Sequence, residues 1–143
     1  MRHIAALLVL SLGACATQDV APPSGKARFN AYPDALYAAF ESACSGPAQT
    51  FSRPEAGVVE CREFLPPEPT AAIILNFDGT PEKLPQLVIR FRTRKDDPGY
   101  LVENDVYLNV PQKSGGPIEV RQNDSRLLRR LDTLYRRAGG VPE

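Results

Sequence analysis

Residues 86–110 read QLVIRFRTRKDDPGYLVENDVYLNV, two runs of alternating side chains on either side of the turn-forming segment DDPG. The first run predicts a strand with one apolar and one largely basic face, because successive side chains of a strand point to opposite sides. The apolar set is Leu87, Ile89, Phe91 and Thr93, and the set opposite is Val88, Arg90, Arg92 and Arg94. This pattern is typical of an antiparallel sheet with one face on the core and one face toward water.

The turn at Asp96–Gly99 predicts how the two runs pair. A four-residue turn places apolar residues opposite apolar residues and arginines opposite carboxylates. The predicted opposite positions are Leu87 with Leu108, Ile89 with Val106, Arg90 with Asp105, and Arg92 with Glu103. One register therefore satisfies both faces of the hairpin.

Other segments with a period of two predict further strands, separated by turns rich in proline and glycine. These segments are Val58–Phe64, Thr70–Phe77 and Ile118–Gln122, with Thr50–Phe51 as a short addition. Together with the hairpin they predict an antiparallel sheet of four to five strands.

A helix is predicted on each side of this strand region. The first runs from Pro33 to about Ala43, since proline suits a first helical position and Leu36, Phe40 and Cys44 recur on one face. The second runs from about Ser125 to Arg137, with Asp124 as its N-cap. Its apolar stripe, which can pack on the sheet or lie on lipid, is Leu127, Leu128, Leu131, Leu134 and Tyr135. The predicted fold class is α+β, with both helices packed on the sheet.

The N-terminus has the pattern of an export signal. Arg2 provides a positive charge, Ile4–Leu12 form an apolar run too short to span a bilayer, and Leu12-Gly13-Ala14-Cys15 place small residues before a cysteine. This segment resembles the lipobox of bacterial lipoproteins. The resemblance implies a signal peptide at residues 1–14, and a mature chain that begins at a Cys15 carrying diacylglyceryl and acyl groups such as palmitate.

Residue 16 bears on the location that this resemblance implies. In Gram-negative lipoproteins an aspartate after the cysteine favours the inner membrane, and this chain has Ala16 there. We therefore expect an anchor in the outer membrane, facing the periplasm. Residues 15–28 mix prolines, glycine and small polar residues and predict a lipidated flexible tether, which leaves residues 29–143 as a single domain.

Cys44 and Cys61 are the two cysteines that remain after Cys15. An oxidising compartment favours a disulfide between them, worth about 3 kcal/mol in the chain-entropy model. Two independent buried thiols are the alternative.

The composition and motifs exclude several function classes. The chain has 17 basic and 17 acidic residues, which gives no basic excess for nucleic acid. Its one histidine is His3, so cleavage before Cys15 removes histidine-based catalysis and metal binding. We expect no enzymatic activity and no cofactor.

The basic face of the hairpin is the candidate binding surface. Arg90, Arg92, Arg94 and Tyr107 are residue types favoured as anchors for a protein partner, although a solvated sheet face also explains them. A second basic set near the C-terminus suits anionic headgroups or peptidoglycan acids. It consists of Arg121, Arg126, Arg129, Arg130, Arg136 and Arg137. The last two also complement the helix dipole, which explains them without a ligand. The expected role is an accessory subunit or adaptor in envelope assembly, transport or maintenance. The alternatives are a ligand-binding module for a cell-wall or outer-membrane component, and a mainly structural lipoprotein.

Overall fold

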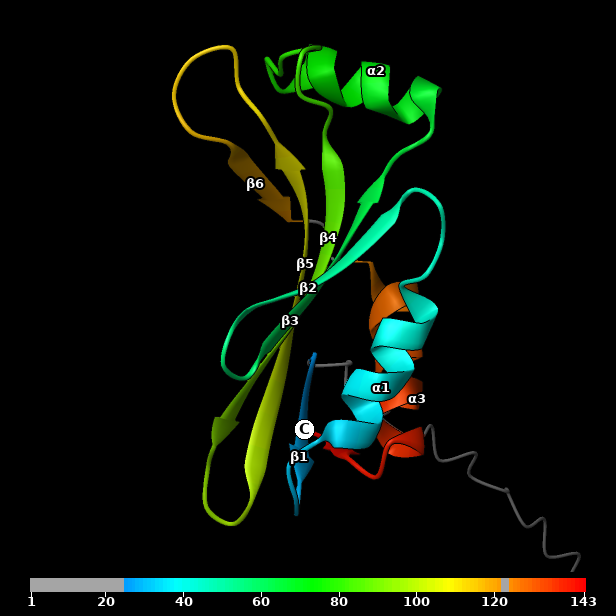
Figure 1. Cartoon of the computed structure of the whole chain (residues 1–143), viewed down its shortest axis with the longest axis vertical. Helices are drawn as coiled ribbons and strands as arrows, with labels where there is room; N and C mark the ends of the chain where they lie inside the picture. Colours follow the sequence, from blue (N-terminus) through cyan, green and yellow to red (C-terminus); the bar gives the residue numbers. More distant parts are fainter. Residues whose placement is uncertain (1–24, 122–123) are drawn as a thin grey trace, which may run out of the picture.

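The computed structural model describes residues 25–121 and 124–143, which form one antiparallel sheet and three helices (Figure 1). The order along the chain is β1 (Lys26–Phe29), α1 (Asp34–Ala43), β2 (Gln49–Glu55), β3 (Val58–Phe64), α2 (Pro67–Asn76), β4 (Gln86–Lys95), β5 (Tyr100–Val110), β6 (Ile118–Arg121), α3 (Ser125–Arg137) and β7 (Val141–Pro142). The α+β class is therefore as predicted.

The sheet has the strand order β2-β3-β4-β5-β1-β7, and β6 also pairs with β5. One edge of β5 pairs with β4 along nearly its whole length. The other edge is shared, because Tyr100–Glu103 pair with β1 and Tyr107–Val110 pair with β6. The described residues thus contain seven strands, more than the four to five that we predicted.

The central hairpin has the predicted bounds and register. Ile89 lies opposite Val106, Leu87 opposite Leu108, Arg90 opposite Asp105 and Arg92 opposite Glu103. The turn closes with a 3.0 Å hydrogen bond from the Asp96 N–H to the Gly99 carbonyl. All four predicted opposite positions are confirmed.

The helices α1 and α3 pack side by side on one face of this sheet (Figure 1). Phe91 of β4 lies between Phe40 of α1 and Tyr135 of α3, with ring centroids 4.8 and 5.8 Å away. The N-cap prediction for α3 is confirmed, since the Asp124 carboxylate accepts a 2.8 Å hydrogen bond from the Arg126 N–H. Edge-to-face rings tie both helices to the middle of the sheet.

The segment Thr70–Phe77, which we predicted as a strand, belongs to helix α2 instead. Its apolar residues follow one another without alternation, so their spacing does not separate a strand from a helix. The proline-rich stretch Pro66–Pro69 before them, which is typical of a turn, contains the start of the helix. Pro67 occupies the first turn, where a missing N–H costs nothing, and Ala71 and Ala72 have the highest helix propensity.

Two short strands were not predicted. Lys26–Arg28 fall within the predicted tether, but they lie in β1 and pair with Leu101–Glu103 of β5. β7 completes this edge by pairing with β1. Both strands are too short to show a period of two. The domain therefore includes residues that we assigned to the tether, and the predicted signal peptide, Cys15 and tether residues 16–24 lie outside the described residues.

β2 is longer than the predicted Thr50–Phe51 and ends in an irregular pairing with β3 between Ser52 and Glu55. Pro54 lies in that irregular part, which is tolerated because β2 is an edge strand. Cys44, directly after α1, and Cys61 of β3 form a disulfide with their Cα atoms 5.8 Å apart. The bond links α1 to the sheet inside the core.

Candidate functional site

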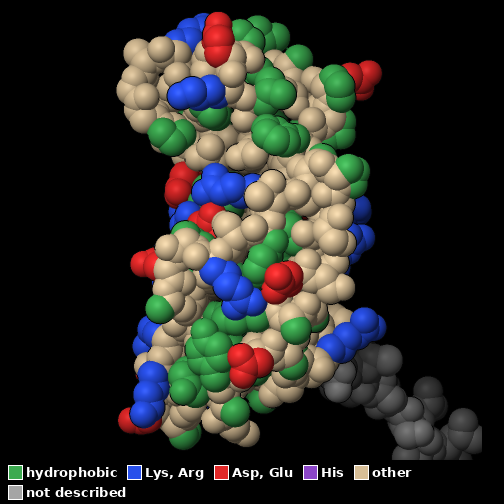
Figure 2. Space-filling view, viewed as in Figure 1, with side chains coloured by type: hydrophobic (Ala, Val, Ile, Leu, Met, Phe, Trp, Pro, Cys, Tyr) green, Lys and Arg blue, Asp and Glu red, His purple; other side chains and the backbone are tan. Residues whose placement is uncertain are grey.

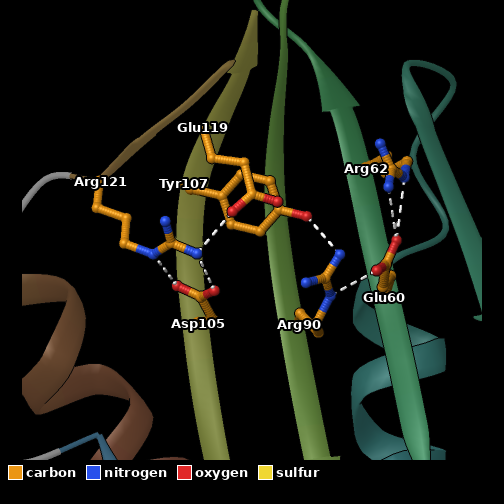
Figure 3. A network of polar contacts seen from close by, with 7 residues as sticks. All are labelled: Glu60, Arg62, Arg90, Asp105, Tyr107, Glu119 and Arg121. Atoms are coloured by element: carbon orange, nitrogen blue, oxygen red, sulfur yellow. Dashed lines mark hydrogen bonds and ion pairs between the residues drawn. The ribbon is translucent and has the colours of Figure 1, made fainter. Parts of the chain in front are cut away.

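The side of the sheet opposite α1 and α3 carries a cluster of charged residues, which we call the polar face (Figure 3). Its position follows from the alternation of the strands, since Cys61, Ile89, Phe91 and Val106 point into or against the core and their neighbours point the other way. The polar face comprises Glu60, Arg62, Arg90, Arg92, Asp105, Tyr107, Glu119 and Arg121.

Glu60 of β3 is the buried carboxylate of this face, with 4% of its surface exposed. Its Oε1 accepts a 2.6 Å hydrogen bond from Arg90 Nε, and its Oε2 accepts a 2.9 Å bond from Arg62 Nη2. The fold brings these groups together because Glu60 lies opposite Arg90 and Arg62 follows two residues later on the same strand. A buried carboxylate requires such paired donors, so Glu60 holds both guanidinium groups in place.

Tyr107 of β5 is the buried aromatic residue of this face, with 2% of its surface exposed. Its hydroxyl oxygen accepts a 2.6 Å hydrogen bond from Arg90 Nη2. The guanidinium carbons of Arg90 and Arg121 lie 5.2 and 5.4 Å from its ring centroid, both within cation–π range. Burial raises the pKa of the Tyr107 phenol, and the charge of Arg90 opposes that rise.

Arg121 of β6 completes the network at its exposed edge (Figure 3). Its Nε and Nη2 donate to the two oxygens of Asp105 at 2.9 and 2.7 Å, and Nη2 also donates to Glu119 at 2.6 Å. The hydrogen bonds to Asp105 and Glu119 raise the pKa of Arg121. The pKa of Arg90 is also raised: burial is the largest single cause and acts to lower it, but the hydrogen bond to Glu60 and the charges of nearby acidic groups together outweigh it.

Two of the four predicted binding residues, Arg90 and Tyr107, are in direct contact in this network. Arg92 lies on the same face and is exposed, and it forms no ion pair with any residue in the described ranges. Arg94 lies nearer the turn and pairs with Asp96 at 3.2 Å. The predicted group therefore divides into a hydrogen-bonded pair, an exposed arginine and a residue near the end of β4 that pairs with the turn.

The predicted opposite positions of the hairpin do not become ion pairs between β4 and β5. Arg90 pairs with Glu60, Asp105 pairs with Arg121, and Glu103 pairs with Lys26 at 2.9 Å. A central strand has neighbours on both sides, and each carboxylate binds a cation from the strand on its far side. This competition leaves Arg92 available at the surface.

A hollow of about 270 Å³ lies beside Arg92. Its charged lining contains four basic and two acidic side chains, and no helix of the described chain contributes to it. The lining residues are Gly25, Lys26, Arg90, Arg92, Glu103, Asn104, Asp105 and Arg121. The excess of positive charge suits a carboxylate or another small anion.

Several residues of this site were not among the predicted binding residues: Glu60, Arg62, Glu119 and Arg121. The alternation of Val58–Phe64 already places Glu60 and Arg62 on one face of their strand. The alternation of Ile118–Gln122 does the same for Glu119 and Arg121. The missing information was the strand order, which brings β3 and β6 to opposite sides of the hairpin.

The acidic groups of the polar face are paired. Its carboxylates Glu60, Asp105 and Glu119 each accept from arginine, so the network presents neither an unpaired acid nor an activated nucleophile. Within residues 25–121 and 124–143, no three histidine, cysteine, aspartate or glutamate side chains converge to hold a metal ion. The helices of these same ranges lack the length and apolar character needed to cross a bilayer.

Comparison of this chain with models of protein families, with curated proteins and with solved structures gave no match.

Proposed function

We propose that this protein is a non-catalytic, lipid-anchored lipoprotein that acts as an adaptor in the cell envelope, with the polar face as its docking surface for a protein partner. The observation that carries the proposal is the Tyr107 ring held between Arg90 and Arg121 on the side of the sheet opposite α1 and α3. Arginine is among the side chains enriched in residues that dominate protein–protein binding, and here the exposed Arg121 provides the contact while the buried Tyr107 helps to hold it in place.

The network supports this role because its side chains are already ordered. Glu60 fixes Arg90, and Arg90 fixes Tyr107 through hydrogen bonds of 2.6 Å each. Preorganised side chains lose less rotamer entropy when a partner binds. The exposed Arg92 and the neighbouring hollow then offer a positive contact point, so we expect an acidic side chain of the partner to bind there.

The proposed anchor is Cys15 and rests on the sequence. Arg2, the apolar run Ile4–Leu12 and Leu12-Gly13-Ala14-Cys15 resemble the bacterial lipobox. The diacylglyceryl group that this implies provides the two chains that stable anchoring needs. Mass spectrometry of the N-terminal peptide tests this part separately, since a mature chain that begins elsewhere than at an acylated Cys15 would contradict it.

The docking surface is tested by co-purification from envelopes solubilised in mild detergent, with tagged wild type and tagged Arg92→Glu. Arg92 is suited to the test because it is exposed and contributes no ion pair to the described fold. Lys83→Glu is the matched control, since it reverses one exposed charge away from the polar face. We expect a stoichiometric partner with wild type and Lys83→Glu that is lost with Arg92→Glu. The same partners with all three proteins would contradict the proposed surface.

The hollow beside Arg92 favours a second candidate function, a binding module for an acidic cell-wall component. Its cations and its volume of about 270 Å³ suit a small carboxylate-bearing group. Calorimetry with solubilised cell-wall fragments tests this candidate. Heat of binding that disappears with Arg92→Glu, in the absence of any protein partner, would favour the binding module over the adaptor.

A further inference from the structure

Helix α3 carries five exposed arginines that the polar face does not use. We call them the arginine face of α3: Arg126, Arg129, Arg130, Arg136 and Arg137. Spacings of four and seven residues place Arg126, Arg130 and Arg137 on one side of the helix. Leu131 and Tyr135 lie on the other side and are buried against the sheet. The packing of α3 therefore directs its arginines outward.

Figure 2 shows basic side chains along both edges of the molecule, including the edge on which α1 and α3 lie.

These arginines differ from those of the polar face in their partners. Arg62, Arg90 and Arg121 each bind a carboxylate, whereas none of the five on α3 forms an ion pair within the described residues. Asp124 caps the helix through the Arg126 N–H, and one carboxylate oxygen of Asp132 is buried without a hydrogen bond. The acidic residues of α3 therefore leave the arginine face with its full positive charge.

The helix dipole explains only part of this pattern. Arg136 and Arg137 lie in the last turn, where cations are favourable. Arg126, Arg129 and Arg130 lie in the first half of the helix, and the first turn contains no acidic residue. Arg126 lies in the first turn, where a cation opposes the dipole, whereas Arg129 and Arg130 lie in the second turn, beyond most of the dipole's effect. The dipole therefore explains none of these three exposed arginines, which remain open to a negatively charged surface outside the fold.

The position of the chain's entry into the fold identifies that surface. Gly25 lies against α3, since its carbonyl accepts a 3.4 Å hydrogen bond from the Tyr135 hydroxyl. Cys15 precedes Gly25 by ten residues in the sequence, which reach at most about 35 Å even when fully extended. A lipid on Cys15 therefore keeps the whole entry region, including α3, within that reach of the membrane surface. Gly25 also lines the hollow of the polar face, so it is the absence of ion pairs on the arginine face of α3, within the described chain, that favours α3 as the membrane contact.

We propose that the arginine face of α3 binds the anionic headgroups of the membrane that carries the Cys15 anchor, an inference that rests on the anchor of the proposed function. The polar face lies on the opposite side of the sheet from α3, so this contact turns the polar face away from the bilayer and toward a partner. Each arginine near an anionic surface strengthens binding about fivefold at low salt. The helix contact and the lipid chain together then fix the orientation of the domain.

The test measures partition of the full chain onto phosphatidylcholine vesicles with and without phosphatidylglycerol. The variant is Arg126→Gln/Arg129→Gln/Arg130→Gln. The matched control is Lys83→Gln/Lys95→Gln/Lys113→Gln, which removes three exposed basic side chains outside both the polar face and α3. We expect the α3 variant to lose the extra binding to phosphatidylglycerol vesicles by about tenfold or more. The control should bind like wild type, and all three proteins should bind equally to pure phosphatidylcholine.

The extra binding should also disappear in about 1 M salt, where the screening length is about 3 Å. Equal binding of wild type and the α3 variant to anionic vesicles would overturn the proposal and leave an acidic protein as the partner of this helix. An equal loss in the control would also overturn it, because binding would then depend on net charge alone. Circular dichroism of the variants excludes unfolding as the cause. Mass spectrometry shows separately whether Cys15 carries an acyl group. A failure of the proposed anchor is thereby distinguished from a failure of the arginine face to bind anionic vesicles.

Discussion

The two faces of β3, β4 and β5 use alternate residues of the same strands and are stabilised in different ways. On the apolar face, Phe91 contacts Phe40 and Tyr135, and the stabilisation comes from buried area and ring packing. On the polar face, Glu60, Arg90 and Tyr107 are joined by directional hydrogen bonds. Packing tolerates few changes of volume, whereas a charged network with access to water can exchange partners. The comparison shows that the same strands order one face by packing and the other by directional hydrogen bonds.

The largest effect is expected on the apolar face, from Phe91→Ala. Phe91 is fully buried between two helices, so its truncation removes contacts with both and leaves a cavity. We expect a loss of about 3 to 5 kcal/mol in the free energy of unfolding, measured by urea denaturation. Phe91→Leu is the conservative control and should lose clearly less. Equal losses in the free energy of unfolding for the two variants would contradict this expectation. They would show that the volume kept by leucine contributes little to the packing of α1 and α3.

A smaller effect is expected on the polar face, from Glu60→Leu. The change leaves Arg62 and Arg90 without their shared carboxylate, but their side chains are 31% and 20% exposed and regain water. We expect a loss of about 2 kcal/mol, less than for Phe91→Ala. The double variant Glu60→Leu/Arg90→Leu should recover part of this loss, because it removes an unpaired cation. A double variant less stable than the single one would show that Arg90 stabilises the fold mainly through Tyr107.

The two faces also differ in how far the sequence predicts them: it predicts the register of the hairpin but not the ion pairs of the polar face. The alternation of Gln86–Lys95 and the DDPG turn predicted the register of the hairpin, including Ile89 opposite Val106. The ion pairs were not predictable from that hairpin alone, because Arg90 and Asp105 each bind a partner from a third strand. Choosing those partners requires the strand order, which alternation does not provide.

The elements that sequence reasoning missed have physical reasons of the same kind. β1 and β7 contain four and two residues, too few for a period to be visible. The Ala71–Leu75 run in α2 is apolar without alternation, so strand and helix were not distinguished. By contrast, α3 was predicted with its bounds and its Asp124 cap, because an N-cap residue and a long apolar stripe act together there.

A pH titration is expected to distinguish the buried tyrosines of the two faces. Burial raises the pKa of Tyr37, on the buried side of α1, to about 12, and the hydroxyl donates to the Gly57 carbonyl. Below the ordinary value of 10 both folded and unfolded states hold the proton, so the stabilisation is fully present. Between pH 10 and about 12 only the unfolded state ionises, and the free energy of unfolding falls as pH rises.

Urea unfolding across this pH range, with phenolate absorbance as a second readout, measures the effect. Tyr37→Phe should reduce the alkaline loss of stability. Tyr107→Phe should reduce it less, because the charge of Arg90 opposes the rise in the pKa of Tyr107. A larger change from Tyr107→Phe would show that the polar face excludes water as fully as the core does.

The smallest effect is expected from Arg121→Gln, at the exposed edge of the polar face. Arg121 binds Asp105 and Glu119, yet its side chain is 53% exposed, and ion pairs so open to water contribute little to the stability of a fold. Thermal unfolding should therefore change little, whereas co-purification of the proposed partner should weaken because one side of the Tyr107 ring is uncovered. Arg121→Lys keeps the charge without the paired hydrogen bonds, so it tests whether geometry or charge matters. A loss of stability comparable to that of Glu60→Leu would place Arg121 among the structural groups and weaken the argument for a docking surface. A stable variant with reduced partner capture would instead show that this face is ordered for binding at little cost to the fold.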